Sequence, residues 1–436
     1  MSPHALIESS PMEDLTKRLA SNVEALIDYI RSTGGVQPSF DRSCPTSVIP
    51  QDAPPEAQMA RERIMDQCLK LLQLATGPSD YMINMQTNYQ YVACLQWLCH
   101  FDIFRLVPAK GAIPYSDLAS QAGCTETRLK SVVRMAMTTG LFLEPTPQQV
   151  SHSATSALFA ASEDHRNWAA YATDVLAPVA AGMTEAHERW PAATTRTRTA
   201  YNVAFRRDLP FFDRLGQNPA LHRQFAGYMR ALATNQGTHM KHLVSGLDWG
   251  RNPNATVVDV GGSTGHSCIA LAQAYPSLHF IVQDLPEVVE GGPKILEGIK
   301  DAGVARRIQY QSHNFFESNP VIGADFYLLR LVLHNWNADD CVRILRAIVP
   351  AMQANPNANV VVMDCVLPAP GSVPRSVERV VRVRDLTMTQ MFNSQERALE
   401  DWEAIFERAD PGLRIASVSQ PVGSVLALIK VELMAQ

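Results

Sequence analysis

The spacing of apolar residues predicts helices through the first half of the chain and short strands through much of the second half. Residues 12–32 repeat apolar side chains at helical spacing, and the pattern resumes at residues 56–76. The segment between them, residues 34–55, is rich in proline and glycine, which is typical of a linker. We therefore expect residues 1–85 to form a helical extension with a proline-rich linker.

The pattern of residues 86–160 indicates one unit built around a helix-turn-helix. A mostly apolar helix is expected at residues 91–107, followed by two helices that meet at a turn around Gly123. Two short strands, at residues 141–145 and 148–153, would complete a winged helix.

A winged helix raises the question of DNA binding, because its second helix, here residues 125–137, is the one that reads bases. That helix offers only Arg128, Lys130 and Arg134 as basic residues. The net charge of the chain is −5, which also argues against a nucleic-acid partner. A packing or dimerisation module is therefore the preferred interpretation.

Residues 161–250 continue the helical pattern and are rich in aromatic side chains. Two of their segments, residues 199–215 and 225–244, fit helices that lead towards the second half. We expect this connector to contribute to a substrate pocket.

From residue 254, apolar strands alternate with helical segments, which predicts a parallel sheet covered on both faces. One of these strands is expected to end at Leu333. The last two strands, residues 413–419 and 424–433, are joined by four residues and predict an antiparallel hairpin at the end of the sheet.

The stretch VVDVGGSTGHS, residues 257–267, predicts a buried strand, a glycine-rich turn and the start of a helix. It is not a P-loop, because His266 instead of lysine follows the last glycine, and its glycine spacing differs from the dinucleotide fingerprint. Asp284 ends the next strand, where a carboxylate can accept hydrogen bonds from two ribose hydroxyls. The combination favours a ligand with a nucleoside, although the turn could merely connect strand and helix and Asp284 could merely cap the next helix.

His334 is expected just beyond a strand, before a helix that begins at Asn337 or Asp339. Ligands of parallel sheets bind outside the carboxyl ends of the strands, so His334 should lie near the ligand of the glycine turn. An isolated histidine is more often structural, but this position favours a functional role.

The motifs DVGGSTG, VQDLP, HNFF, LLRLVLHNW and NSQER occur in the order seen in S-adenosylmethionine-dependent O-methyltransferases of small phenolic metabolites. From about residue 86 onward, the chain resembles the plant caffeate-type enzymes and, more closely, the fungal polyketide O-methyltransferases. The resemblance implies an α/β fold with a Rossmann-like class I methyltransferase sheet, in which residues 251–436 form the S-adenosylmethionine-binding catalytic domain. A mainly α-helical, winged-helix-like dimerisation domain would precede it, so a homodimer is expected.

The resemblance also implies the residues that hold the cofactor and carry the reaction. His334 matches the general base, and Asp364 and Glu396 match two acidic residues that flank it; plant relatives usually have glutamate at the Asp364 position. Relatives commonly have aspartate where this chain has Asn314, whose side-chain oxygen can still accept a hydrogen bond from the adenine amino group. The positions matched to cofactor contacts are Gly261, Gly262, Asp284, Leu285, Asn314, Phe315 and Arg330.

Composition limits the other partners. The eight cysteines are scattered without metal-binding spacing, which favours a reduced, cytoplasmic protein and predicts no metal. Neither a secretory signal nor an apolar stretch long enough to cross a bilayer is evident, so we expect no membrane partner.

Three functions remain open from the sequence. The first is methyl transfer to a hydroxyl of a small aromatic, polyketide-derived metabolite. The second is a pericyclic or dehydration step on the same fold, with the cofactor bound but not consumed. The third is a winged-helix regulator with an inert cofactor domain.

Overall fold

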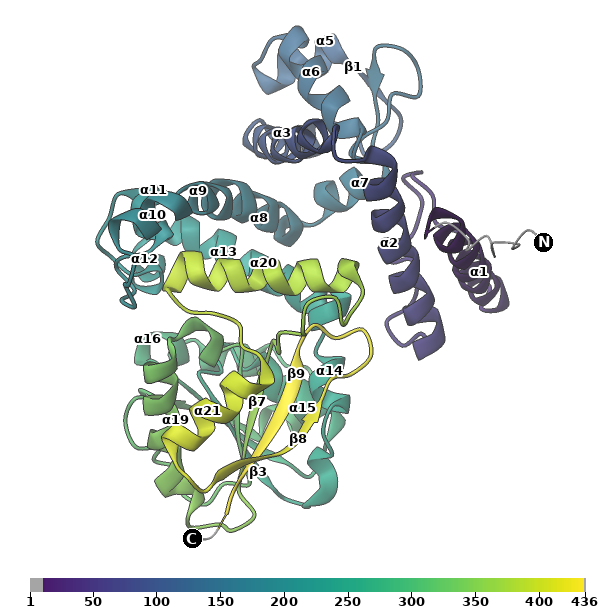
Figure 1. Ribbon diagram of the computed structural model, residues 1–436. Helices are drawn as coiled ribbons and strands as arrows, with labels where there is room; N and C mark the ends of the chain where they lie inside the picture. The colour runs from purple at the N-terminus through teal and green to yellow at the C-terminus, as the bar shows by residue number, and fades with distance from the viewer. Residues whose placement is uncertain (1–10, 435–436) are drawn as a thin grey trace, which may run out of the picture. The chain divides into compact units, whose positions relative to one another are not determined.

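The computed structural model describes residues 11–434, and the chain divides into two units (Figure 1). Unit 1 comprises the residues up to 181 together with residues 212–231 and 374–377. Unit 2 comprises residues 182–211, residues 232–373 and the chain from residue 378 onward.

Unit 1 begins with the two predicted helices, α1 (Pro11–Ser32) and α2 (Pro55–Thr76), which pack against each other. The proline-rich segment between them forms neither helix nor strand, apart from one isolated bridge at Asp41. It is nevertheless anchored, because Ile49 and Ala53 are buried against Ile30 and Ala57.

The predicted helix-turn-helix is confirmed by α5 (Tyr115–Ala122) and α6 (Glu126–Met137), with Gly123 in the left-handed conformation between them. The prediction of one helix over residues 91–107 is wrong. Helix α3 (Tyr81–His100) starts ten residues earlier, and Asp102, at a φ of 54°, separates it from α4 (Ile103–Leu106).

The predicted strand pair of the wing is confirmed only in part. Strand β2 (Gln149–Val150) pairs with β1 (Ile113–Pro114), a strand that the sequence did not indicate. Residues 141–145 contribute only an isolated bridge between Leu143 and Ser151.

The two helices predicted at residues 199–215 and 225–244 are each broken. In the first of them, the helix that begins at Ala200 ends before Arg206, which has a φ of 51°. Pro210 then favours the start of a new helix at Phe211. The elements from residue 154 to residue 251 are α7 (Ala154–Ala161), α8 (Glu163–Tyr171), a π-helical turn (Ala172–Leu176), α9 (Ala177–Ala181), α10 (Met183–Arg189), α11 (Ala200–Phe205), α12 (Phe211–Gln217), α13 (Pro219–Thr234), a 3₁₀ turn (Gln236–Thr238), α14 (Lys241–Ser245) and a 3₁₀ turn (Trp249–Arg251).

Unit 2 contains a seven-stranded sheet in the order β5-β4-β3-β6-β7-β9-β8. The first five of these are parallel, whereas β9 runs antiparallel to both β7 and β8, which confirms the predicted sheet and its terminal hairpin. The strands are β3 (Thr256–Val260), β4 (His279–Asp284), β5 (Ile308–Ser312), β6 (Phe326–Arg330), β7 (Asn359–Asp364), β8 (Leu413–Ser419) and β9 (Ala427–Leu433).

Helices cover both faces of the sheet because successive strand residues point to opposite sides. Val258 and Val260 pack towards α19 (Ala338–Met352) and α21 (Leu399–Ala409), and Val257 packs towards α14 and α15 (His266–Ala274). The remaining helices of this half are α16 (Pro286–Val289), α17 (Gly292–Glu297), α18 (Ala302–Ala305) and α20 (Arg375–Phe392).

The predicted end of a strand at Leu333 is wrong, since β6 ends at Arg330. Leu331 adopts a φ of 55°, and a 3₁₀ turn (Leu333–Asn335) follows. The start of the next helix is as predicted, with the Asn337 side chain accepting from the backbone N–H of Asp340. His334 therefore lies in a tight turn at the carboxyl edge of the sheet.

Within residues 11–434, no helix is both long and apolar enough to cross a membrane. Over the same range, no group of histidine, cysteine, aspartate and glutamate side chains could hold a metal ion.

Candidate active site

The glycine turn after β3 is pressed against the end of β4. The backbone N–H groups of Gly261 and Gly262 both donate to the carbonyl of Gln283, at 2.8 and 3.0 Å. Gly261 has a φ of 72°, which favours glycine. A Cβ added to Gly262 would lie only 2.6 Å from Cγ of Asp259. Side chains at these two positions would crowd Val332 and Asp259, so the turn requires glycine; we call it the glycine cradle.

Asp284, at the end of β4, ties this turn to the sheet. Its carboxylate accepts from the backbone N–H of Ser263 and from that of Leu285, each at 2.8 Å. Burial raises the pKa of Asp284, and these two hydrogen bonds oppose the shift. Leu285, the next residue, leaves 44% of its surface exposed beside the carboxylate. The structure thus brings the glycine turn, Asp284 and Leu285 together.

The HNFF segment contributes an aromatic wall to the same edge. A Cβ at Gly261 would lie 3.6 Å from the ring of Phe315, which therefore sits beside the turn. Phe315 also packs edge-on to Trp336, with 5.6 Å between ring centroids. The side-chain oxygen of Asn314 accepts from the backbone N–H of Phe316 at 3.2 Å, so one of its acceptor sites is used to stabilise its own loop.

Arg330 ends β6, and its side chain interacts electrostatically with Asp259 of β3. Its guanidinium donates to the carbonyl of Thr238 at 3.2 Å, and burial lowers its pKa to about 10. The buried carboxyl of Asp259 opposes that shift, and burial raises the pKa of Asp259 itself to about 6. Sequence reasoning missed Asp259, although a carboxylate inside the apolar run VVDV was a usable signal.

The most consequential pair in unit 2 is His334 and Glu396. Nδ1 of His334 lies 2.9 Å from Oε1 of Glu396, and the two residues are 7% and 1% exposed. Burial lowers the pKa of His334, but the charges of Glu396 and Asp364 outweigh burial and raise it. Burial raises the pKa of Glu396, but the His334 imidazole together with the Arg384 and Arg397 charges outweighs burial and lowers it. A carboxylate at Nδ1 places the proton there and leaves Nε2 as the basic nitrogen.

Asp364, at the end of β7, differs from Glu396 in its hydrogen bonding. It is completely buried, and neither of its carboxyl oxygens has a hydrogen-bond partner among the described residues. Burial raises its pKa to about 6, while the charge of His334 opposes that rise. Asp364 therefore acts on His334 through its charge, and Glu396 accepts the hydrogen bond of the imidazole.

The NSQER segment also holds the turn that carries His334, which the sequence did not reveal. The Ser394 hydroxyl lies 2.7 Å from the carbonyls of both His334 and Trp336. The buried guanidinium of Arg397 donates to the carbonyls of Leu333 and Trp336, at 3.2 and 2.6 Å. Glu396 thus lies between two residues that fasten its segment to the histidine turn.

Helix α20 holds Glu396 from the other side. Nε of Arg384 lies 3.5 Å from Oε1 of Glu396, and Asp385 accepts from the backbone N–H of Glu396 at 3.0 Å. Neither residue stands out in the sequence, because an Arg-Asp pair in a helix is normally a solvated surface pair.

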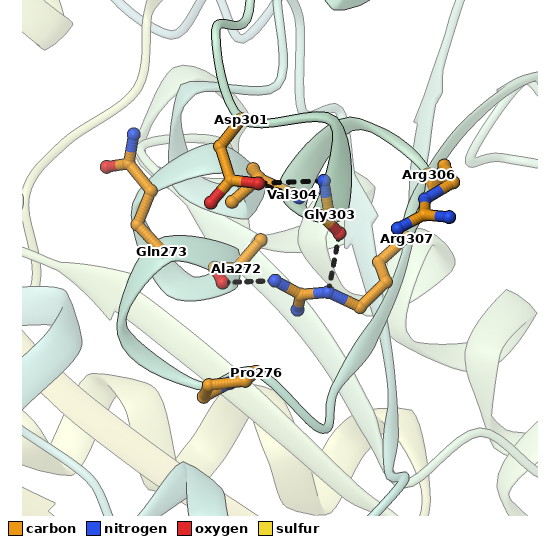
Figure 2. Close-up of a pocket in the computed structure, with 8 residues that line it drawn as sticks. All are labelled: Ala272, Gln273, Pro276, Asp301, Gly303, Val304, Arg306 and Arg307. Carbon is orange, nitrogen blue, oxygen red and sulfur yellow. Dashed lines mark hydrogen bonds between the residues drawn. The ribbon is translucent and has the colours of Figure 1, made fainter.

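A hollow of about 420 Å³ lies away from these residues, where α15 ends and α18 begins (Figure 2). These segments precede β4 and β5, so the hollow is at the amino ends of the strands. Figure 2 shows the guanidinium of Arg307 bonded to the carbonyls of Ala272 and Gly303, and it also donates to those of Tyr275 and Leu278. This arginine ties loops together, and the hollow is not the candidate active site.

Unit 2 combines a mostly parallel sheet, a glycine cradle with a carboxylate on the next strand, and a buried histidine–glutamate pair at the same edge. The protein therefore has a class I methyltransferase fold. Residues 190–410 match the O-methyltransferase domain family, and the chain belongs to that family. This membership confirms the expected S-adenosylmethionine-dependent O-methyltransferase.

Fungal relatives are similar over nearly the whole chain. O-methyltransferase aoiF of Aspergillus oryzae is 51% identical, with 97% of this chain and 100% of the relative covered. O-methyltransferase pgmB of Aspergillus terreus is 47% identical, with 98% and 97% covered. A structure of LepI in complex with SAM has the same fold, at a TM-score of 0.72 and 22% identity, with 96% of this chain and 100% of that chain covered.

The N-terminal extension has a separate similarity. Residues 9–76 match the N-terminal domain of the trypacidin cluster transcriptional coactivator tpcD. The match covers the segment of α1 and α2 and ends before the O-methyltransferase match begins.

Proposed function

We propose that the enzyme methylates a hydroxyl of a small phenolic metabolite, with His334 as the general base. The observation that supports this most directly is the buried His334–Glu396 pair, 2.9 Å apart, at the edge where the glycine cradle opens. A polyketide-derived aromatic acceptor is favoured by the similarity to fungal O-methyltransferases.

The residues at this edge fit S-adenosylmethionine. The cradle at Gly261 and Gly262, which an added Cβ would crowd, suits the methionine part, and Asp284 suits the ribose hydroxyls. Leu285 and Phe315 would flank the adenine, with Asn314 accepting from its amino group, while Arg330 lies at the same edge and interacts with the buried Asp259. When bound, S-adenosylmethionine supplies a methyl group already activated on a sulfonium sulfur.

The chain's own task is then to align the acceptor and remove its proton. A phenol has a pKa of about 10, so little phenolate exists at neutral pH. Nε2 of His334 accepts the phenolic proton, and the Glu396 carboxylate stabilises the resulting imidazolium through Nδ1. Asp364 adds a second negative charge that favours the same protonated state.

The helical connector also approaches this site within unit 2. The guanidinium of Arg196 lies over the ring of Trp336, 4.4 Å from its centroid. The Asn393 side chain donates to the carbonyls of Thr195 and Arg198, at 2.8 and 3.0 Å. We propose that the segment around residues 194–198 forms part of the acceptor pocket.

The first prediction concerns the reaction class. Purified protein incubated with S-adenosylmethionine and a panel of polyketide phenols should add one methyl group to a phenol and form S-adenosylhomocysteine. Mass spectrometry of acceptor and cofactor together checks this. Conversion of an acceptor to an isomer or dehydrated product, with labelled methyl retained on the cofactor, would instead identify the alternative reaction without methyl transfer.

The similarity of residues 9–76 to a coactivator domain favours one second candidate, a regulatory role. A regulator need not transfer a methyl group. The regulatory role would be supported if the protein bound S-adenosylhomocysteine, turned over no phenol in the panel and associated with a transcription factor. The intact histidine–glutamate pair favours the enzyme.

We also propose a homodimer formed through the N-terminal half, in a cytoplasmic protein whose eight cysteines are all free. Helix α3 contains no aspartate, glutamate, lysine or arginine, and its N-terminal turns expose a set of large side chains. These exposed side chains are Tyr81, Met82, Ile83, Met85, Tyr89 and Val92.

The second prediction follows from that exposed face. The protein should sediment as a dimer at micromolar concentration, and Ile83→Lys, at a position 64% exposed, should yield a folded monomer. Val36→Lys, at a position 63% exposed outside this face, should remain dimeric. Analytical ultracentrifugation checks both variants, and a monomeric parent protein would contradict the proposal.

A further inference from the structure

Tyr310, in the middle of β5, contacts the end of the glycine cradle. Its side chain is partly buried, and its hydroxyl donates to the carbonyl of Thr264 at 2.8 Å, across 46 residues of sequence. Strand β5 lies next to β4 and not next to β3, so the contact comes from two strands away. Both residues belong to unit 2. The glycine cradle is therefore held by β5 as well as by β4.

The peptide group between Thr264 and Gly265 closes the glycine cradle, and it is held on both sides. Its carbonyl accepts from Tyr310, and its N–H, which is that of Gly265, donates to the carbonyl of Gly262 at 2.9 Å. A peptide group is planar, so fixing the direction of its carbonyl also fixes the direction of its N–H. Tyr310 thereby stabilises the hydrogen bond that closes the cradle around Gly262.

Two glycines make room for the Tyr310 side chain. Gly265 has a φ of 75°, and a Cβ added there would lie 2.7 Å from the hydroxyl oxygen of Tyr310. Gly292, the first residue of α17, is buried, and a Cβ added there would lie 2.5 Å from Cδ2 of the same ring. The tyrosine thus packs closely between the glycine cradle and α17. Burial raises the pKa of Tyr310 to about 12, so its hydroxyl remains a hydrogen-bond donor at neutral pH.

We propose that Tyr310 is a positioning residue for S-adenosylmethionine: by holding the Thr264 carbonyl, it keeps the glycine cradle in the shape that binds the cofactor. The tyrosine hydroxyl is bonded to the cradle, so Tyr310 acts through the cradle and is not a catalytic residue. This inference rests on the role proposed above for the glycine cradle. It adds a residue of β5 that the sequence did not indicate.

The third prediction tests this role in the full-length protein. Tyr310→Phe should weaken S-adenosylhomocysteine binding by about threefold to tenfold, the change that corresponds to the net contribution of one hydrogen bond. Without the hydroxyl, the closed cradle is less populated, and the affinity falls with the fraction of molecules that retain it. Thr264 is exposed, so water can replace the lost donor and the variant should fold. Calorimetry gives the dissociation constant.

Tyr275→Phe is the matched control. The Tyr275 hydroxyl also donates to a backbone carbonyl, that of Val244 at 2.9 Å, and both tyrosines pack against the same apolar core. Tyr275 directly follows α15, at the end of that helix away from the glycine cradle, so its variant should bind S-adenosylhomocysteine as the parent does. A merely structural role of Tyr310 would lower the melting temperature of both variants and leave both affinities unchanged.

A division between KM and kcat gives a second readout. With any phenol that the parent methylates, Tyr310→Phe should raise the KM for S-adenosylmethionine and leave kcat close to that of the parent. The reason is that the substitution changes cofactor binding and leaves the His334–Glu396 pair intact. A lower kcat at an unchanged KM would contradict a role in cofactor binding.

Parental affinity in soluble Tyr310→Phe would overturn the inference. If Asp284→Ala weakened binding and Tyr310→Phe did not, the proposed place of the cofactor would stand and only the role of Tyr310 would fail. If neither variant weakened binding, the role proposed for the glycine cradle would fail together with the inference.

Discussion

Replacing His334 with alanine should lower methyl transfer by about 10²–10⁴-fold, the usual contribution of general-base catalysis, with little change in affinity for S-adenosylhomocysteine. The imidazole is bonded to Glu396 and not to the glycine cradle, so cofactor binding does not depend on it. The deficit should shrink as pH rises towards the pKa of the phenol, because solvent can then supply phenolate. Steady-state kinetics across pH and calorimetry with S-adenosylhomocysteine measure the two effects.

His334→Gln should be nearly as impaired, because the amide cannot accept the proton. His279→Ala, at an exposed histidine at the start of β4, is the matched control and should retain activity. Full activity of His334→Ala at neutral pH would remove the histidine from the mechanism.

The partner of His334 gives the same prediction a pH signature. Only the neutral imidazole can accept the proton, so the acidic limb of kcat/KM reports the pKa of His334 in the free enzyme. Glu396 raises that pKa, so Glu396→Gln should move the acidic limb to lower pH while lowering the maximal rate. An acidic limb that stays in place would mean that another group titrates there.

Replacing Asp284 with alanine should weaken S-adenosylhomocysteine binding at least about tenfold. A hydrogen bond to a charged group contributes about 1.5–3 kcal/mol, and about 1.4 kcal/mol corresponds to a factor of ten. The loss has a second source in this structure, because the Asp284 carboxylate also holds the N–H of Ser263 in the glycine turn. Calorimetry gives the change in dissociation constant.

Asp284→Asn separates the two sources, since the amide oxygen can still accept from Ser263 without carrying a charge. Asp301→Ala is the matched control: Asp301 also accepts from backbone N–H groups, those of Gly303 and Val304, but at the amino ends of the strands (Figure 2). It should leave affinity intact. Unchanged affinity in Asp284→Ala would place the ribose elsewhere.

The sequence alone determined most of the sheet and the half of the site that is local in the chain. Strand β8 falls at the predicted residues and β4 ends at Asp284 as predicted, because short apolar runs between breaking residues specify strands through side-chain burial. The glycine turn and Asp284 could be predicted together because they follow two neighbouring parallel strands. Ser263 and Asp284 are 21 residues apart in the chain and are joined by a hydrogen bond in the structure.

Burial also explains where the sequence misled. The apolar pattern continues to Leu333, which is fully buried, yet the backbone leaves the sheet after Arg330. Apolar periodicity indicates which side chains are buried and does not indicate which backbone groups form hydrogen bonds. The 3₁₀ turn that carries His334 therefore could not be predicted from the sequence.

The tertiary structure alone decided the electrostatic state of the site. Glu396, 62 residues from His334, is hydrogen-bonded to Nδ1 of that histidine. Asp364 is buried without a hydrogen-bond partner among the described residues. The sequence motifs predicted both acids but could not rank them, because the rank depends on which carboxylate reaches the imidazole in the folded chain.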